Sequence, residues 1–129
     1  MVAGKAAETF GPKLTDEQEI LMHIADMMIE IYVLESSLLR TEKLIGLHGE
    51  EASELYVSMT KLYMHEAIQK IKNHGDEAVA CFTEGDELKV MMMGMKRFTK
   101  FNPVNTKELR RSIAAKMVAE NKFPYSLYN

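Results

Sequence analysis

One stretch, from Thr15 to Ile45, constrains the fold most, because it is apolar on too many sides to stand uncovered. Thr15-Asp16-Glu17-Gln18 is a capping box that predicts a helix start, and Gly46 predicts its end. A helix of this span is about 45 Å long. A surface helix needs an apolar arc of little more than 100°. Here one polar stripe recurs at steps of three, four or seven, and nearly all other residues are apolar; the stripe is Glu19, His23, Asp26, Glu30, Ser37 and Arg40. We therefore predict a central helix that other helices cover on at least two sides.

Hydrophobic spacing and helix-end signals predict the other elements. The expected segments are a partial helix over 1–12, the long central helix over 15–45, helices over 50–72, 76–83, 87–100 and 106–121, and a tail over 122–129. Asn73-His74-Gly75 supplies a stop, while Asp86 and Asn105 supply caps. No strand-like alternation interrupts the pattern. The predicted fold class is all-α, an antiparallel bundle of four to six helices around one long central helix, in a single domain over 1–129.

Composition limits the classes of function. The only cysteine in the 129 residues is Cys81, so an internal disulfide is excluded and a reducing, cytoplasmic setting is expected. No apolar run approaches the roughly 20 residues of a membrane span. Residues 1–85 carry 7 basic and 15 acidic side chains, and residues 86–129 carry 9 and 4. This asymmetry favours attraction between acidic and basic helices over a nucleic-acid surface.

The polar stripe of the long helix is the first candidate site. Ferritin-like metal bundles use Glu-x-x-His at i and i+3 on two helices. Here Glu19 and His23 are four residues apart, and His65 is adjacent to Glu66. Side chains at those spacings do not reproduce that ligand set. An inter-helix or solvated ion-pair stripe is the favoured interpretation over a metal site.

Other candidates also have a structural alternative that we favour. The methionine-rich stretch Asp86–Met95 is expected to fill the core more often than to form a pliable docking groove. Cys81 is expected to be a buried, inert thiol. The basic helix over 106–121 is expected to pack on an acidic side of the bundle rather than on an anionic membrane surface. The four histidines, at 23, 48, 65 and 74, are scattered and accompany no nucleophile motif.

A set of motifs, in the same order along nearly the whole chain, carries a resemblance to a known family. These motifs are Leu14-Thr15-Asp16-Glu17-Gln18-Glu19-Ile20-Leu21-Met22 with Ala25-Asp26-Met27, then Glu35–Leu44, Glu84–Leu88, Gly94–Lys100, Asn102–Arg111 and Ala119–Phe123. With them the sequence resembles the C-terminal extension of acyl-CoA dehydrogenases, particularly the bacterial long-chain and very-long-chain type. Residues 1–7 resemble the interior of a helix in those enzymes, which would explain why no capping residue precedes Val2 and suggests a chain cut from a longer protein. The tail over 124–129 departs from the expected ending.

The resemblance implies a parent enzyme that uses FAD to remove two hydrogens from an acyl-CoA in fatty-acid β-oxidation. Its flavin, its catalytic glutamate base and its substrate groups belong to an upstream core, so no catalytic, cofactor-binding or metal residue is assigned here, neither Glu30 nor Glu66. The implied partners are that catalytic core and further copies of the chain, with peripheral membrane contact as in mitochondrial very-long-chain relatives and no nucleic acid. The alternative is a stand-alone module that self-associates through Met27 and Met28 or through Met91–Met95.

Overall fold

The computed structural model describes residues 1–121, which form five α-helices and one 3-10 helix. In chain order these are α1 (Val2–Phe10), η1 (Gly11–Asp16), α2 (Gln18–His48), α3 (Glu50–Phe82), α4 (Gly85–Phe98) and α5 (Thr106–Glu120). No strand occurs among the described residues. The all-α prediction is therefore confirmed, while the predicted tail over 122–129 lies outside the described residues.

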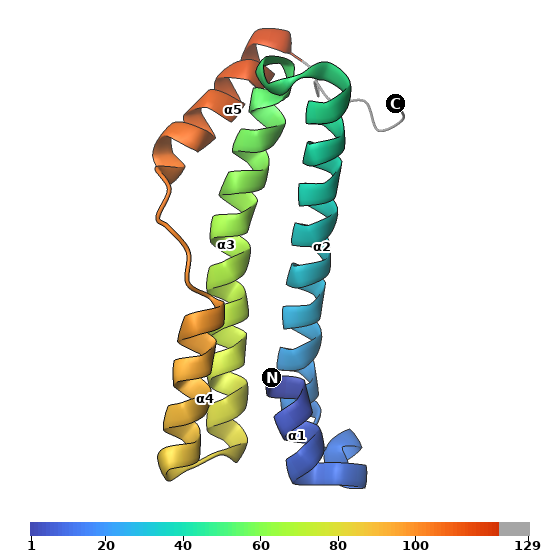
Figure 1. Cartoon of the computed structure of the whole chain (residues 1–129), viewed down its shortest axis with the longest axis vertical. Coiled ribbons are helices and arrows are strands. Elements are labelled where there is room, and N and C mark those ends of the chain that lie inside the picture. Colours follow the sequence, from blue (N-terminus) through green and yellow to red (C-terminus); the bar gives the residue numbers. More distant parts are fainter. Residues whose placement is uncertain (122–129) are drawn as a thin grey trace.

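The two long helices, α2 and α3, run side by side in opposite directions and form the frame of the molecule (Figure 1). α4 packs along the second half of α3, α5 packs against its first half, and α1 contacts both long helices. α3 thus contacts each of the other four helices, whereas α2 lies at one edge. The prediction that the helix over 15–45 is the central one is wrong, because α3 is long enough to hold α4 and α5 end to end.

The predicted helix stop at Asn73-His74-Gly75 is also wrong, because α3 continues through it to Phe82. Gly75 is helical and buried. A Cβ at this position would clash with the thioether of Met95, whose Sδ would lie 2.8 Å away, and would approach the Met27 Sδ to 3.3 Å. The glycine therefore serves close packing of α2 and α4 on α3, and the predicted helices over 50–72 and 76–83 are one element.

Three predicted helix ends are displaced. Thr15 lies in η1, where its hydroxyl donates to the carbonyl of Pro12, so the predicted capping box does not form and α2 begins at Gln18. Gly46 lies inside α2, and the helix ends instead before Gly49, whose φ of 84° is a left-handed conformation that favours glycine. α1 ends at Phe10, before the predicted end at residue 12.

Of the two predicted helix caps near the end of the chain, Asp86 and Asn105, one forms and the other does not. Asp86 is not the cap of α4, because the helix begins at Gly85 and the Asp86 carboxylate accepts from Lys89 Nζ at 2.8 Å. Asn105 is the cap of α5, since its Oδ1 accepts from the backbone N–H of Glu108 at 3.2 Å. That predicted cap is confirmed.

The hydrophobic core occupies only one half of the molecule. Its buried side chains come from α1, the start of α2, the end of α3 and α4, and are Val2, Ala6, Ile20, Ile24, Met27, Ala78, Val79, Met91 and Met95. Phe10 and Phe82 close this half with an edge-to-face contact at 5.7 Å. α5 has no buried residue. Cys81 is exposed, contrary to prediction, because the uninterrupted α3 turns residues 78 and 79 inward and 81 outward.

Candidate functional site

Three residues of the polar stripe of α2, namely His23, Asp26 and Glu30, contact side chains of α3. At its centre the Glu30 carboxylate accepts from Lys70 Nζ and from the Tyr63 hydroxyl, each at 2.7 Å. Tyr63 and Lys70 are seven residues apart, so they share one face of α3. The favoured interpretation of the stripe, an inter-helix ion pair, is confirmed at this position.

Burial and hydrogen bonding shift the pKa values of this cluster. The Lys70 ammonium, followed by the Tyr63 hydroxyl, lowers the pKa of Glu30 by stabilising its carboxylate. Burial, followed by the hydrogen bond to Glu30, raises the pKa of Tyr63 to about 12. The hydrogen bond to Glu30 likewise raises the pKa of Lys70. These shifts keep Glu30 and Lys70 charged and Tyr63 neutral, which suits a structural contact rather than proton transfer.

Two further contacts join α2 to α3, one on each side of the Glu30 cluster. Toward the start of α2, His23 Nδ1 lies 3.1 Å from His74 Nδ1 on α3. Toward its end, the Thr41 hydroxyl donates to the carbonyl of Ser37 at 2.9 Å, so the Thr60 hydroxyl, 2.7 Å away, must donate to Thr41. Each contact joins α2 to α3 across a large sequence separation.

The candidate metal residues do not converge on one point. His23 and Asp26 turn toward His74, whereas Glu30 turns toward Lys70. Within residues 1–121, no three histidine, cysteine or acidic side chains are placed to hold a metal ion together. The stripe therefore offers inter-helix contacts and no assembled ligand set in the described part of the chain.

An apolar groove lies between α1, α2, α3 and α4, with a volume of about 530 Å³. Its walls are almost entirely hydrophobic and are made by Met1, Val2, Ala3, Ile24, Met27, Met28, Ile31, Leu34, Ile68, Ile71, Met95, Phe98 and Thr99. Met91 and Met95 are buried core residues, as favoured from the sequence, but Met95 also lines this groove and Met93 is 63% exposed. The methionine-rich stretch thus contributes both to the core and to an accessible surface.

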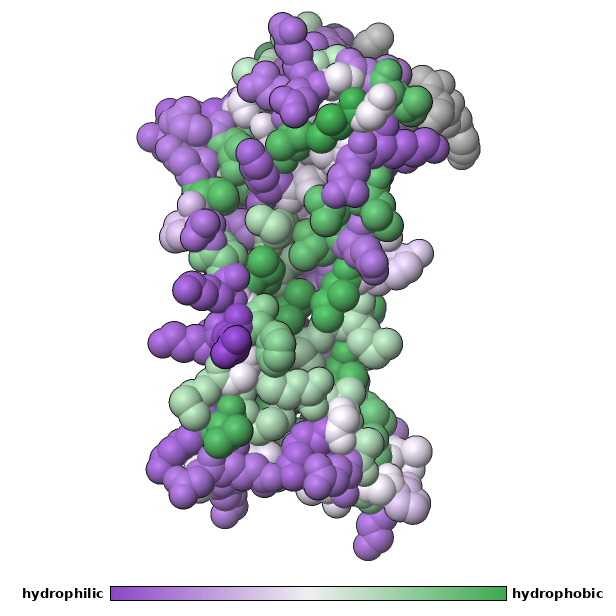
Figure 2. All heavy atoms as spheres, in the orientation of Figure 1, coloured by the Kyte–Doolittle hydropathy of each residue, from purple (hydrophilic) through white to green (hydrophobic). Residues whose placement is uncertain are grey.

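The side of α2 that is turned away from α3 carries several large exposed apolar side chains, with Ser36 and Lys43 among them, and no other helix of the described residues covers it. We call this side the outer face of α2, and its residues are Met22, Ile29, Tyr32, Val33, Leu39 and Leu47. Tyr32 is 71% exposed and Ile29 59% exposed. Figure 2 looks across α2 and α3 side by side rather than onto this outer face, and it shows hydrophobic residues along most of that view, between hydrophilic flanks. The prediction that other helices cover this helix on at least two sides is wrong for the described residues, because α2 packs along its length on α3 alone and meets α1 and η1 only near its start.

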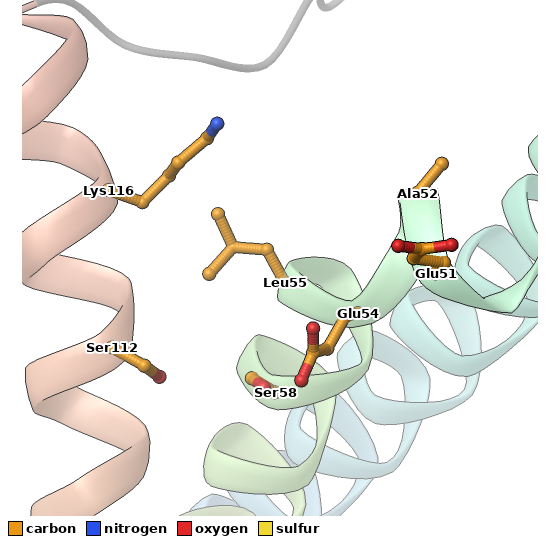
Figure 3. A pocket seen from close by; sticks show the side chains of 7 residues that line it. All are labelled: Glu51, Ala52, Glu54, Leu55, Ser58, Ser112 and Lys116. Carbon is orange, nitrogen blue, oxygen red and sulfur yellow. The ribbon is translucent and has the colours of Figure 1, made fainter.

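A second, polar cavity of about 430 Å³ separates the start of α3 from α5 (Figure 3). Glu51, Glu54 and Ser58 line it from α3, and Ser112 and Lys116 from α5. Lys116 is engaged by Glu120 at 2.6 Å. Near the middle of α3, the Glu66 carboxylate accepts a hydrogen bond from Arg110 of α5 at 2.6 Å. This contact confirms the predicted attraction between the basic last helix and an acidic surface.

Neither cavity fits a flavin dinucleotide. The pyrophosphate of such a cofactor is ordinarily held by free cations, by a glycine-rich turn or by the first amides of a helix. The groove is apolar, and the polar cavity presents Glu51 and Glu54 beside a lysine that is already paired. These two cavities therefore lack the groups that ordinarily hold the pyrophosphate of a flavin dinucleotide.

The architecture defines an all-α packing module, with a polar line joining two long helices and an apolar surface left open. Comparison with known proteins narrows this class. The family model described as "Acyl-CoA dehydrogenase, C-terminal domain" matches residues 1–97. The chain belongs to this family.

Two Bacillus proteins show the same relationship. A probable acyl-CoA dehydrogenase of Bacillus subtilis strain 168 is 35% identical over 121 residues, which cover 94% of this chain and 20% of that protein. The crystal structure of an acyl-CoA dehydrogenase complexed with FAD from Bacillus anthracis superposes with a TM-score of 0.94 at 37% identity, covering 97% of this chain and 22% of that one. The chain thus spans about a fifth of the length of each relative. The predicted resemblance to a C-terminal domain is confirmed, and the fold of this domain is shared with an FAD-complexed enzyme.

Proposed function

We propose that this chain serves an FAD-dependent acyl-CoA dehydrogenase of fatty-acid β-oxidation as its C-terminal helical domain. In this proposal it packs on the catalytic core, supports oligomer or partner contacts, and performs no catalysis by itself. The relatives support this role, because about four-fifths of their length has no counterpart in this chain. The cytoplasm is the expected location of such an enzyme.

The observation that carries the proposal is the outer face of α2. Large contiguous apolar patches are rare on monomeric proteins and usually mark a surface that another chain or domain covers. Each Å² of apolar surface removed from water contributes roughly 25 cal/mol before the costs of association. The residues of the outer face recur at helical spacing over 22–47, so the surface is long and suited to packing against other helices.

The proposal is tested by mixing this chain with the part of a relative that has no counterpart in it. The Bacillus subtilis relative, without the region that matches this chain, is the probe, and binding is measured by calorimetry. We expect a complex that Tyr32→Glu with Leu39→Glu weakens at least about tenfold, because two charges would be buried unpaired. Lys61→Glu, at an exposed position of α3, is the matched control and leaves binding unchanged. A purified chain that binds flavin and oxidises acyl-CoA on its own would overturn the proposal.

A stand-alone module that self-associates is the second candidate, and the exposure of Met28 and Met93 supports it. Both thioethers are adaptable contact groups on an accessible surface. Sedimentation at micromolar concentration separates the two proposals. A dimer that Met28→Glu or Met93→Glu dissociates would favour the module, whereas a monomer that binds the probe above would favour the domain.

A further inference from the structure

The apolar groove runs along α2 and begins where α1 begins. Its wall on α2 consists of residues at helical spacing, namely Ile24, Met27, Met28, Ile31 and Leu34. The step from Ile24 to Leu34 measures about 15 Å along the helix axis, which is roughly three turns. Met1, Val2 and Ala3, at the start of α1, line the same groove.

α1 points into this groove. Figure 1 shows α1 and α2 side by side and running in opposite directions, with the first residue of α1 beside α2. Val2 and Ala6 of α1 belong to the same core cluster as Ile20 and Ile24 of α2, which holds α1 against the start of α2. Because the two helices are antiparallel, the axis of α1 extended backwards from Val2 runs from Ile24 toward Leu34.

Large apolar side chains around the groove remain exposed with every described helix in place. Met28 is 64% exposed, Ile31 51% and Phe98 75%. Ile68 and Ile71 add an apolar wall from α3. Contiguous apolar surface of this kind usually marks a place that another segment covers. Within residues 1–121, the open side of the groove has no helix over it.

α1 is too short to close the bundle along the groove. It has 9 residues, whereas α4 has 14 and α2 has 31. Val2 and Ala6 are four residues apart, so apolar residues that precede Val2 at the same spacing would face the groove. The first amides of a helix have no acceptor within it, and Met1, at the N-cap, provides no side-chain cap. A preceding helical turn supplies these acceptors, so one added segment would satisfy both the amides and the groove.

We propose that the groove seats an amphipathic helix of about three turns that continues α1 backwards and forms the end of the catalytic core. This inference rests on the proposed function, in which such a core precedes the domain. The apolar stripe of the added helix lies on Ile31 and Ile68. The outer face is a different surface, because successive helical residues are about 100° apart and Tyr32 is therefore turned away from Ile31. The core thus holds the domain at two surfaces, the groove and the outer face.

Extension of the 129-residue chain tests this inference. The probe is the chain extended at its N-terminus by the roughly 20 residues, enough for five turns, that directly precede the matched region in the Bacillus subtilis relative. We expect circular dichroism to show added helix. The thermal midpoint Tm should rise by about 5–10 °C, because exposed apolar side chains leave water. In the methyl NMR spectrum the Met28 signal should shift on extension, whereas that of Met22, on the outer face, should not.

Matched variants of the extended chain locate the added helix. Ile31→Glu, in the groove, should remove most of the gain in Tm, because it buries a charge without a partner. Val90→Glu, at an exposed apolar position of α4 outside the groove, is the control and should keep the gain. Extension by the same residues in scrambled order should give no gain. If Ile31→Glu fails to fold, the Met28 and Met22 signals decide.

Three results would overturn the inference. If extension leaves Tm unchanged, the groove does not take this helix, while binding of the separate core at the outer face would still support the proposed function. An equal gain in Ile31→Glu, or with the scrambled extension, would place the added residues elsewhere. A gain that sedimentation finds only in a dimer would mean that a second copy of the chain fills the groove.

Discussion

The two ends of the α2–α3 pair are held together by different means. At one end, α1, α4, the first turns of α2 and the last turns of α3 enclose every member of the hydrophobic core. At the other end, the second half of α2 and the first half of α3 meet no other helix of residues 1–121 than α5, which buries none of its own residues. The buried side chains there are Thr41 and Ser53. We call these the packed end and the open end.

One helix pair thus combines a buried hydrophobic core at one end with an exposed apolar and polar surface at the other. Burial of apolar area dominates stability, so the packed end should set the free energy of unfolding. The open end relies on polar contacts and exposed ion pairs, which contribute little each. Regions with few buried apolar contacts open first in native proteins. Single substitutions at the two ends test this contrast.

Removal of a core methionine should distinguish the packed end most clearly. Met95 is 4% exposed and contacts α2 and α3, so Met95→Ala loses a buried side chain and leaves a cavity. We expect the free energy of unfolding to fall by about 2–5 kcal/mol, measured by urea denaturation. Met93→Ala, on the same helix but largely exposed, is the control and should change it by less than about 0.5 kcal/mol. Equal losses in the two variants would contradict a core that is confined to this end.

Two glycines inside the long helices should respond in opposite directions to alanine. At Gly75 a Cβ collides with the Met95 thioether, so overpacking should destabilise by about 1–3 kcal/mol. At Gly46 a Cβ meets nothing within 4 Å, so better helix propensity should stabilise by up to about 1 kcal/mol. Urea denaturation measures both. A gain in stability at Gly75 would mean that Met95 can move aside at no cost, and combination with Met95→Ala should remove the penalty.

The Glu30 cluster lies between the two ends and should show a specific pH dependence. Glu30→Gln weakens the hydrogen bonds from Lys70 and Tyr63, at a cost of about 1–2 kcal/mol at pH 7. Because the folded pKa of Glu30 lies below its ordinary value of 4.5, its contribution is present above that value and is lost as the pH falls through the folded pKa. The difference between the unmodified chain and Glu30→Gln should therefore shrink below about pH 4.5. Glu35→Gln, exposed on the same helix, should show no such dependence.

Several features of the two ends can be predicted from the local sequence pattern, and others cannot. Helix content, the Asn105 cap, the ion-pair stripe and the excess of apolar surface on α2 follow from local spacing, and the structure confirms them. The same spacing wrongly predicted helix ends at Gly46 and Gly75. Glycine is common at helix ends, but it also occurs inside helices, where it permits close packing. Only Met95, twenty residues further along, shows which role Gly75 has.

The wrongly predicted helix end at residues 73–75 also concealed part of the α2–α3 contact site. A helix stop at residues 73–75 removes His74 from the face that Tyr63 and Lys70 share, so its contact with His23 cannot be anticipated. The contact spans 51 positions and depends on the register of two helices, which local patterns do not specify. The position of α3 at the centre depends likewise on its full length. Long-range register, rather than the identity of the helices, is what the sequence pattern leaves undetermined.

The smallest expected effect concerns the ion pair that fastens α5 at the open end. Arg110 and Glu66 are 2.6 Å apart, but their side chains are 62% and 42% exposed, so water screens most of the attraction. Arg110→Ala should lower the free energy of unfolding by no more than about 0.5 kcal/mol, close to the effect of the control Arg111→Ala. Hydrogen exchange should nevertheless reveal a local change, since α5 buries nothing that would hold it in place once this pair is removed. Faster exchange confined to α5 would sharpen the contrast between the ends, whereas a global loss comparable to that of Met95→Ala would show that the open end is as firmly built as the packed one.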